Sequence, residues 1–389
     1  MLGRLAAATA ALLVTTAAPA TAADDAWDVP HSATITVDGH GHGHGRGLSQ
    51  EGAANAAGQG LGYRDIVAFY YPGTSWGTAA GPMRVFLTKG DLKNAVLVQP
   101  RSGLVAAKVG GGRSWNLAKA KPRASAWRIV PDGDRASVLQ YRQRGWHQLQ
   151  RVTGQLEFSA QGKPVRLRRN DGTVAQYRGA IRSVPSSPGN RIAVNVLPME
   201  AYLRGVVPAE AVASTFPQQA LRAQAVAARS YAAAKRAARP DKLYDVDDTE
   251  ASQVYLGYDR EYPTSDQAVQ ATAREILTYD GAPALTEFTA SNGGWTVAGD
   301  APYLPAQPDP YDGDTWGPVT FADTEIEAAW PTIGDLTRIE AGGRDGHGEW
   351  GGRVGTVTLT GTAGTATMSG TAFAARLHLQ SSWLTMSVR

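Results

Sequence analysis

The chain of 389 residues contains no cysteine, which excludes disulfide bridges and thiolate metal sites. Its folded state must therefore be stabilised by packing and hydrogen bonding. Beyond the first 23 residues the sequence also lacks an apolar run long enough to cross a membrane. A glycine-rich phosphate loop, a dinucleotide-binding fingerprint and a Ser-His-Asp order are absent too. These absences argue against nucleotide-dependent chemistry and against serine-triad hydrolysis.

An excess of charge of one sign is also missing. The 38 basic residues nearly balance 35 acidic ones, and the formal net charge is +3. So small an excess gives no reason to expect a nucleic-acid partner. A local basic patch could still meet an anionic wall polymer, or it could form a solvated strand face. The arginines concerned are Arg166, Arg168, Arg169, Arg178 and Arg182.

The first 23 residues are predicted to be a secretory signal peptide. Arg4 supplies the positive start, residues 5–18 form the apolar core, and the small residues 20–23 form the cleavage site. The sequence therefore predicts a secreted protein, extracellular or at the cell wall, with no membrane span after signal cleavage.

The 44 glycines and the short runs of threonine, valine and tyrosine favour strands over a helix bundle. We expect an α+β fold, with a strand-rich body around a central pair of alanine-rich helices. Predicted strands in the first half are residues 83–87, 95–98, 104–109, 126–130 and 164–167. The expected divisions are a signal peptide (1–23), an N-terminal Gly/His and Tyr-Tyr-Pro-Gly segment packing on the core (24–81), a β-rich subdomain (82–192), a catalytic core (193–300) and a C-terminal β-rich subdomain (301–389).

The central stretch of the chain predicts two helices. Pro198 suits the first turn of the first helix, and Gly205 is a natural stop. A second helix is expected to open at Pro217, capped by Ser214 or Thr215 in a Thr-x-x-Gln box. Its alanines recur at helical spacing, which predicts close approach to other backbone and hence a fully covered helix.

Glu210 falls on the predicted connection between these helices, among valine, proline and alanine residues. An apolar pocket disfavours the charged carboxylate and raises its pKa towards neutrality. A carboxyl in that state can donate a proton to a glycosidic oxygen. Two structural roles also fit the pattern: a cap for the following helix, or an ion pair with an arginine.

Three histidines at every second position, His40, His42 and His44, would lie on one face of a strand and could bind zinc or copper. No cysteine or carboxylate completes a recognisable ligand set, however. The alternating glycines could instead let backbone amides and His44 approach a ligand closely. The acidic stretch 245–250 lacks the glycine and the terminal glutamate of a calcium loop. We therefore expect neither a metal nor another cofactor.

Six motifs stand out in the N-terminal and central parts of the chain. Residues 197–210 read LPMEAYLRGVVPAE, and residues 223–231 read AQAVAARSY. Residues 43–53 read GHGRGLSQEGA and are followed by YYPGT at 70–74; shorter motifs are Gln253-x-Tyr255-x-Gly257 and TASNGG at 289–294. Together they resemble the SpoIID/LytB family, named after stage II sporulation protein D and the LytB-type modifier proteins. In that family the glycine-histidine motif usually follows the central helices, whereas here it precedes them.

This resemblance implies a lytic transglycosylase that cleaves the glycan backbone of peptidoglycan at N-acetylmuramic acid. Glu210 takes the family's general-acid position, and a single carboxyl can act first as acid and then as base without a cofactor. The residues implied to position the sugar are His44, Ser49, Gln50, Gln253, Tyr255, Ser291 and Asn292. Ser291 and Asn292 are expected on the cleft wall that faces Glu210, and Glu287 is a second carboxylate of interest.

Two alternatives remain open. The LytB branch of the family implies a non-catalytic modifier that binds glycan strands and stimulates another cell-wall hydrolase. The partners would then be peptidoglycan and such a hydrolase. The other alternative is a metal hydrolase centred on His40, His42 and His44.

Overall fold

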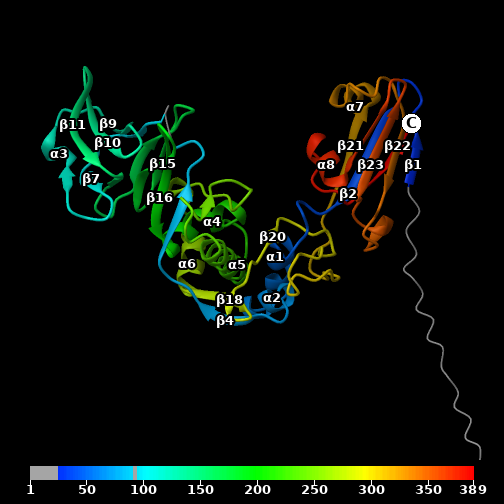
Figure 1. Ribbon diagram of the computed structural model, residues 1–389. Coiled ribbons are helices and arrows are strands. Elements are labelled where there is room, and N and C mark those ends of the chain that lie inside the picture. The colour runs from blue at the N-terminus through cyan, green and yellow to red at the C-terminus, as the bar shows by residue number, and fades with distance from the viewer. Residues whose placement is uncertain (1–24, 91–93) are drawn as a thin grey trace, which may run out of the picture. The chain divides into compact units, whose positions relative to one another are not determined.

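The structure, a computed structural model, describes residues 25–90 and 94–389. The predicted signal peptide lies outside the described residues. The described chain forms two compact units: residues 25–39 with Gly317–Arg389, and His40–Trp316 (Figure 1). Helices and sheets follow one another in both units, so the predicted α+β class is confirmed. Within the described ranges, no helix combines the length and the apolar character needed to cross a membrane.

The smaller unit contains two sheets and two short helices. One sheet has the order β1 (Asp25–Asp28), β22 (Leu336–Gly342), β23 (Thr356–Gly361), β24 (Thr365–Ser369). The other has the order β21 (Thr315–Ala322), β2 (Thr34–His40), β25 (Leu384–Val388). The helices are α7 (Asp323–Ala329) and α8 (Gly370–Arg376), with a 3₁₀ turn η2 at Glu349–Gly351.

The larger unit holds four sheets. A six-stranded sheet has the order β11 (Gly145–Thr153), β10 (Ala136–Gln143), β9 (Ala126–Asp132), β6 (Val96–Val98), β13 (Val165–Arg168), β14 (Val174–Tyr177). A seven-stranded sheet has the order β17 (Val246–Asp247), β5 (Pro82–Phe86), β16 (Asn190–Pro198), β15 (Ala180–Ser187), β12 (Leu156–Ser159), β7 (Val105–Lys108), β8 (Ser114–Asn116). Two small sheets are β19 (Ala282–Pro283), β18 (Glu275–Tyr279), β4 (Ser75–Thr78), and β20 (Phe288–Thr289) with β3 (Leu48–Ser49). The five predicted strands are present as β5, β6, β7, β9 and β13.

The helices of the larger unit are α1 (Gln50–Gly58), α2 (Tyr63–Tyr70), α3 (Leu117–Ala120), α4 (Met199–Glu210), α5 (Gln218–Ala237) and α6 (Pro263–Ala271), with a 3₁₀ turn η1 at Tyr258–Arg260. Helices α1, α2, α4 and α6 pack against the central helix α5, whereas α3 packs against β7 and β8. On one side α5 contributes Leu221, Ala225 and Ala228 to the apolar cluster of the sheets and α4. On the other side it contributes Ala223 and Ala227 to a cluster with α1 and α2. Helix α5 is therefore covered on both sides, with alanine at many of its buried positions, and the predicted covered helix is confirmed.

The prediction that the first central helix stops at Gly205 is wrong. Helix α4 continues through Pro208 and ends at Glu210. A Cβ atom at Gly205 would lie 2.6 Å from the ring of Tyr255 and 3.1 Å from the carbonyl oxygen of Gly257. The glycine is therefore needed for close packing rather than for termination. As a consequence, Glu210 stands on the last turn of a packed helix and not on a connecting loop.

The predicted cap of α5 is also wrong. Pro217 occupies the N-cap position, and no side chain caps the helix. The Gln218 amide instead donates to the carbonyl oxygen of Thr264 at 2.9 Å. A capping box needs a Ser or Thr at the N-cap itself, and here Pro217 lies between Thr215 and the helix.

Candidate functional site

The carboxyl group of Glu210 is held from two sides. The backbone N–H of Val254 donates to Oε1 at 2.6 Å, and the side chain of Gln50 also hydrogen-bonds the carboxyl. Gln50 is the first residue of α1, whereas Val254 belongs to the irregular segment between β17 and η1. Three segments that are distant in sequence therefore meet at this one side chain.

The pKa of Glu210 is raised to about 7, chiefly because burial disfavours the charged form. The bonds from Val254 and Gln50 lower it, and the negative charge of Glu250 raises it. The position of Glu210 at the C-terminal end of α4 acts in the same direction as burial, because the helix dipole is negative there. The direction predicted from its apolar neighbours in the sequence is confirmed, and the carboxyl can be protonated near neutral pH.

A cavity of about 420 Å³ opens over Glu210. Its size lies within the range of about 300–1,000 Å³ typical of small-ligand pockets. His42, His44 and Gln50 line it from the N-terminal motif, and Tyr231 of α5 lines it from the core. The glycine-histidine segment therefore reaches Glu210 although it precedes the central helices in the chain. His42 and His44 are exposed, so the cavity is open to solvent.

The histidine segment does not form the predicted strand face. Strand β2 ends at His40, and every second residue after it is a glycine with a positive φ angle: Gly41, Gly43, Gly45 and Gly47. A Cβ atom at Gly47 would lie 1.9 Å from the carbonyl oxygen of Glu287, so the glycine allows close approach to protein backbone rather than to a ligand. His42 and His44 reach the cavity lining and His40 does not. Among the described residues, no group of three or more His, Asp or Glu side chains is arranged to hold a metal ion.

Two further carboxylates lie on the cavity wall. Glu287 is paired with Arg46, whose Nε and Nη2 donate to its two oxygens at 3.0 and 2.9 Å. This pair compensates the charge of Glu287. Glu250 is exposed at the rim and was not identified from the sequence. In the sequence, Glu250 is marked only by its place in the acidic stretch 245–250.

Ser49, Ser291 and Asn292 are enclosed by the protein and do not line the cavity. Ser49 caps α1 and donates to Asp312 at 2.6 Å, and Ser291 donates to the same carboxylate at 2.9 Å. The Asn292 amide donates to Asp309 at 2.7 Å. These hydroxyl and amide groups are used in a network that fastens the N-terminal motif to the segment after β20. In this conformation they support the cavity wall instead of contacting a sugar.

Gln253 and Tyr255 are also buried, and the segment that carries them is not a strand. Gln253 accepts from the hydroxyl of Tyr202 at 3.0 Å and donates to the carbonyl oxygen of Ala228. The Tyr255 hydroxyl donates to Asn195 at 2.8 Å. Both side chains thus anchor the segment on either side of Val254. Their contribution to the site is to aim the Val254 amide at Glu210.

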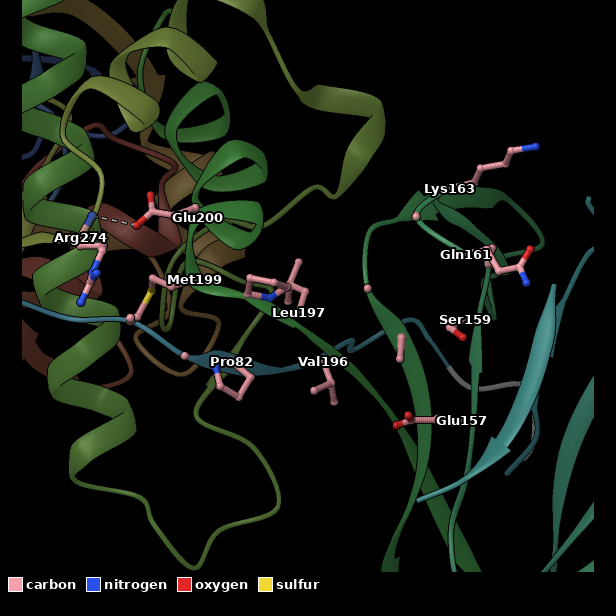
Figure 2. A pocket seen from close by; sticks show the side chains of 17 residues that line it. Pro82, Glu157, Ser159, Gln161, Lys163, Val196, Leu197, Met199, Glu200 and Arg274 are labelled. Atoms are coloured by element: carbon pink, nitrogen blue, oxygen red, sulfur yellow. Dashed lines mark hydrogen bonds between the residues drawn. The ribbon is translucent and has the colours of Figure 1, made fainter. Parts of the chain in front are cut away.

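A larger cavity lies elsewhere in the unit, at the first turn of α4 (Figure 2). It measures about 790 Å³ and is lined largely by apolar atoms of β5, β12 and β16, with Glu200 and Arg274 at one side. Glu200 cannot take the role of Glu210, because its two oxygens accept from the buried Arg229 at 3.0 and 2.7 Å. Both oxygens of this carboxylate are thus used as acceptors within the protein.

Comparison with known proteins covers the segment that contains α4, Glu210 and α5. Residues 188–279 match the family described as stage II sporulation protein, SpoIID. Within this range the chain is similar to the SpoIID family. The matched range includes Glu210 and Val254, whereas the cavity residues His44 and Gln50 lie outside it.

Individual relatives show the same partial similarity. An uncharacterised protein of Brachyspira hyodysenteriae is 38% identical over 136 residues, which are 33% of this chain and 36% of the relative. The amidase enhancer of Bacillus subtilis is 35% identical over 131 residues, 32% of this chain and 17% of the enhancer. Stage II sporulation protein D of Bacillus amyloliquefaciens is 31% identical over 167 residues, 38% of this chain and 48% of that protein. This chain therefore covers less than half the length of each relative.

Proposed function

We propose that the protein is a secreted lytic transglycosylase that cleaves the glycan strands of peptidoglycan, with Glu210 as both acid and base. The observation that carries this proposal is a half-buried carboxyl whose pKa is raised to about 7 at an open cavity. No lysine or arginine among the described residues contributes to that pKa. Such a group can be protonated at the pH at which a glycosidic oxygen must receive a proton.

The reaction follows from one carboxyl acting twice. Protonated Glu210 donates its proton to the glycosidic oxygen, and the bond from that oxygen to C1 of N-acetylmuramic acid breaks. The resulting carboxylate accepts the proton of the primary hydroxyl on the same sugar, and that oxygen forms a bond to C1. The product is an anhydro ring, and no water is consumed. Val254 and Gln50 hold the carboxyl in position during both steps.

The arrangement of carboxylates supports this reaction over ordinary hydrolysis. A glycosidase needs two carboxyl groups that flank the bond, one of them acting as nucleophile or as base for water. Glu287 is occupied by Arg46, and Glu250 stands exposed at the rim. Glu210 is thus the one carboxyl of the cavity that is both shielded from water and without an ion pair to a described residue.

Product analysis tests this proposal directly. Digestion of purified glycan strands with the protein is expected to give fragments that end in anhydro-muramic acid. The masses of the two fragments from one cleavage should add up to the mass of the parent strand, because no water is added. Mass spectrometry of the fragments distinguishes this outcome. Fragments that carry one added water, or an absence of fragments, would contradict the proposal.

The pH dependence provides an independent prediction. Because Glu210 must be protonated to act as acid, kcat/KM is expected to fall above pH 7, by about tenfold per unit once the group is ionised. Initial rates of anhydro-product formation between pH 5 and 9 measure this fall in kcat/KM. A rate that rises steadily through pH 8 would assign the essential group to a different residue.

A second candidate function is a non-catalytic modifier that binds glycan strands and stimulates another cell-wall hydrolase. Similarity to a protein named amidase enhancer favours it. The cavity would then serve for binding alone, and replacing Glu210 with glutamine would leave the stimulation of a purified amidase intact. Under the lytic proposal the same replacement removes the activity.

A further inference from the structure

A second cavity, of about 450 Å³, lies at the C-terminal end of α4. It is lined by residues 208–214, which include the end of α4, and by residues 259–262. Ala209 and Glu210 belong to the walls of both cavities. The two cavities, which are similar in size, therefore adjoin at Glu210.

Exposed apolar side chains gather at this second cavity. Five large apolar side chains are notably exposed among the described residues, and two of them, Val212 at 50% and Tyr262 at 42%, line it. A third, Tyr258 at 37%, belongs to the adjoining turn η1 and carries the guanidinium of Arg178 over its ring at 4.8 Å. Exposed apolar side chains that lie close together are typical of binding surfaces, whereas isolated ones are common on any protein surface.

Besides Glu210, the two carboxylates that line the second cavity already have partners within the protein. Glu261 accepts from Arg178 and Arg204, and Asp259 accepts from the backbone and the side chain of Gln176. Arg260 forms no ion pair with a described residue. The surface thus offers apolar and aromatic groups together with the guanidinium donors of Arg260, which suits a ligand that has apolar C–H faces and many oxygen atoms.

We propose that this second cavity is a sugar-binding subsite, and that the two cavities together hold one glycan strand across Glu210. The inference rests on the proposed function, since it places sugars on both sides of the bond that Glu210 would protonate. The ring of Tyr262 and the side chain of Val212 contact the C–H faces of a sugar ring, and Arg260 donates to its oxygens. An aromatic ring supplies a large contact area at little cost in conformational entropy.

The subsite is tested by binding, in the full-length chain with Glu210 replaced by glutamine so that no turnover occurs. The probe is a peptide-free octasaccharide of alternating N-acetylglucosamine and N-acetylmuramic acid, with affinity measured by calorimetry. Tyr262→Ala is expected to weaken binding about tenfold, the equivalent of roughly 1.4 kcal/mol. Tyr262→Phe, which keeps the ring, is expected to bind as the parent does.

Leu243→Ala is the matched control, because Leu243 is also 42% exposed and lines neither cavity. His44→Ala, in the first cavity, is expected to weaken binding as well, and its effect should add to that of Tyr262→Ala because one strand contacts both residues. Unchanged thermal unfolding of each variant shows that the fold is intact.

The inference is overturned if Tyr262→Ala binds the octasaccharide as tightly as the parent, or if Leu243→Ala weakens binding equally. These outcomes are independent of the lytic reaction. A protein that cleaves glycan but holds it in the first cavity alone passes the product test and fails this one. A glycan-binding protein without lytic activity does the reverse.

Discussion

Replacing Glu210 with glutamine is expected to reduce the rate of anhydro-product formation by about 10²- to 10⁴-fold, the usual contribution of a general acid–base group. Glutamine has nearly the same shape and can still accept from the Val254 amide, but it has no acidic proton to transfer to the glycosidic oxygen. Binding of glycan strands should therefore persist while cleavage stops. Turnover and affinity measured on the same strands separate the two effects.

The same replacement is expected to alter stability in a pH-dependent way. The pKa of Glu210 is about 7 in the folded chain and near 4.5 when unperturbed, so between these values the folded state binds more protons than the unfolded state. The free energy of unfolding then falls as pH rises from about 4.5 to 7, by about 3 kcal/mol in total. Glutamine does not titrate, so the variant should lack this loss and should be more stable than the parent at pH 8.

Urea unfolding at pH 5 and pH 8 measures this difference. Asp300→Asn serves as the control, because Asp300 is an exposed carboxylate whose replacement by the amide should change neither activity nor the pH dependence of stability. Equal pH dependence in the parent and in Glu210→Gln would show that the carboxyl is not held protonated by the fold. A variant that retains full turnover would exclude Glu210 as the acid.

Arg229→Met is expected to cost about 3–5 kcal/mol in the free energy of unfolding, because it removes several hydrogen bonds from a charged donor, each of which contributes about 1.5–3 kcal/mol. The Arg229 side chain is fully buried in α5. It donates to both oxygens of Glu200 and to the carbonyl oxygens of Ala225, Val269 and Glu275. Methionine fills much of the volume but cannot donate to the carbonyl oxygens of Val269 and Glu275, while Glu200 keeps the bond from the Arg274 backbone N–H.

This loss would be a large part of the 5–15 kcal/mol that stabilises a typical domain. Arg166→Met provides the control, since Arg166 points outward from β13 and its replacement should change stability by less than about 0.5 kcal/mol. Chemical unfolding of both variants gives the comparison. A cost below 1 kcal/mol for Arg229→Met would mean that the ion pair does not hold the start of α4 on α5.

The connection between these predictions is the helix α4. Arg229 fixes its first turn through Glu200, and Glu210 stands on its last turn. A rise of about 1.5 Å per residue separates the two by about 15 Å along a continuous helix. The position of the acid is thus set by an ion pair one helix length away, together with the contact of Gly205 on Tyr255. A site carried by a packed helix is held more rigidly than one on a loop.

Sequence alone determined the helix pair, the covered character of α5 and the apolar surroundings that raise the pKa of Glu210. Each of these depends on local periodicity or on neighbouring side chains, which a linear pattern records directly. The strands β5, β6, β7, β9 and β13 were predictable for the same reason. The hydrophobic pattern did not indicate that the long hairpin of β10 and β11 would form, because its polar residues obscure the alternation.

Only the tertiary structure decided which polar side chains reach the cavity. Ser49, Gln253, Tyr255, Ser291 and Asn292 carry groups suited to sugars, yet all five are buried with protein partners. Gln50, in contrast, reaches Glu210 from the N-terminal motif, and the amide that meets the carboxyl is the backbone N–H of Val254. A sequence pattern records which residues carry donors and acceptors, but the partner of each one depends on contacts between segments that are distant in the chain. That is why the raised pKa of Glu210 could be predicted from the sequence, whereas its hydrogen-bond partners could not.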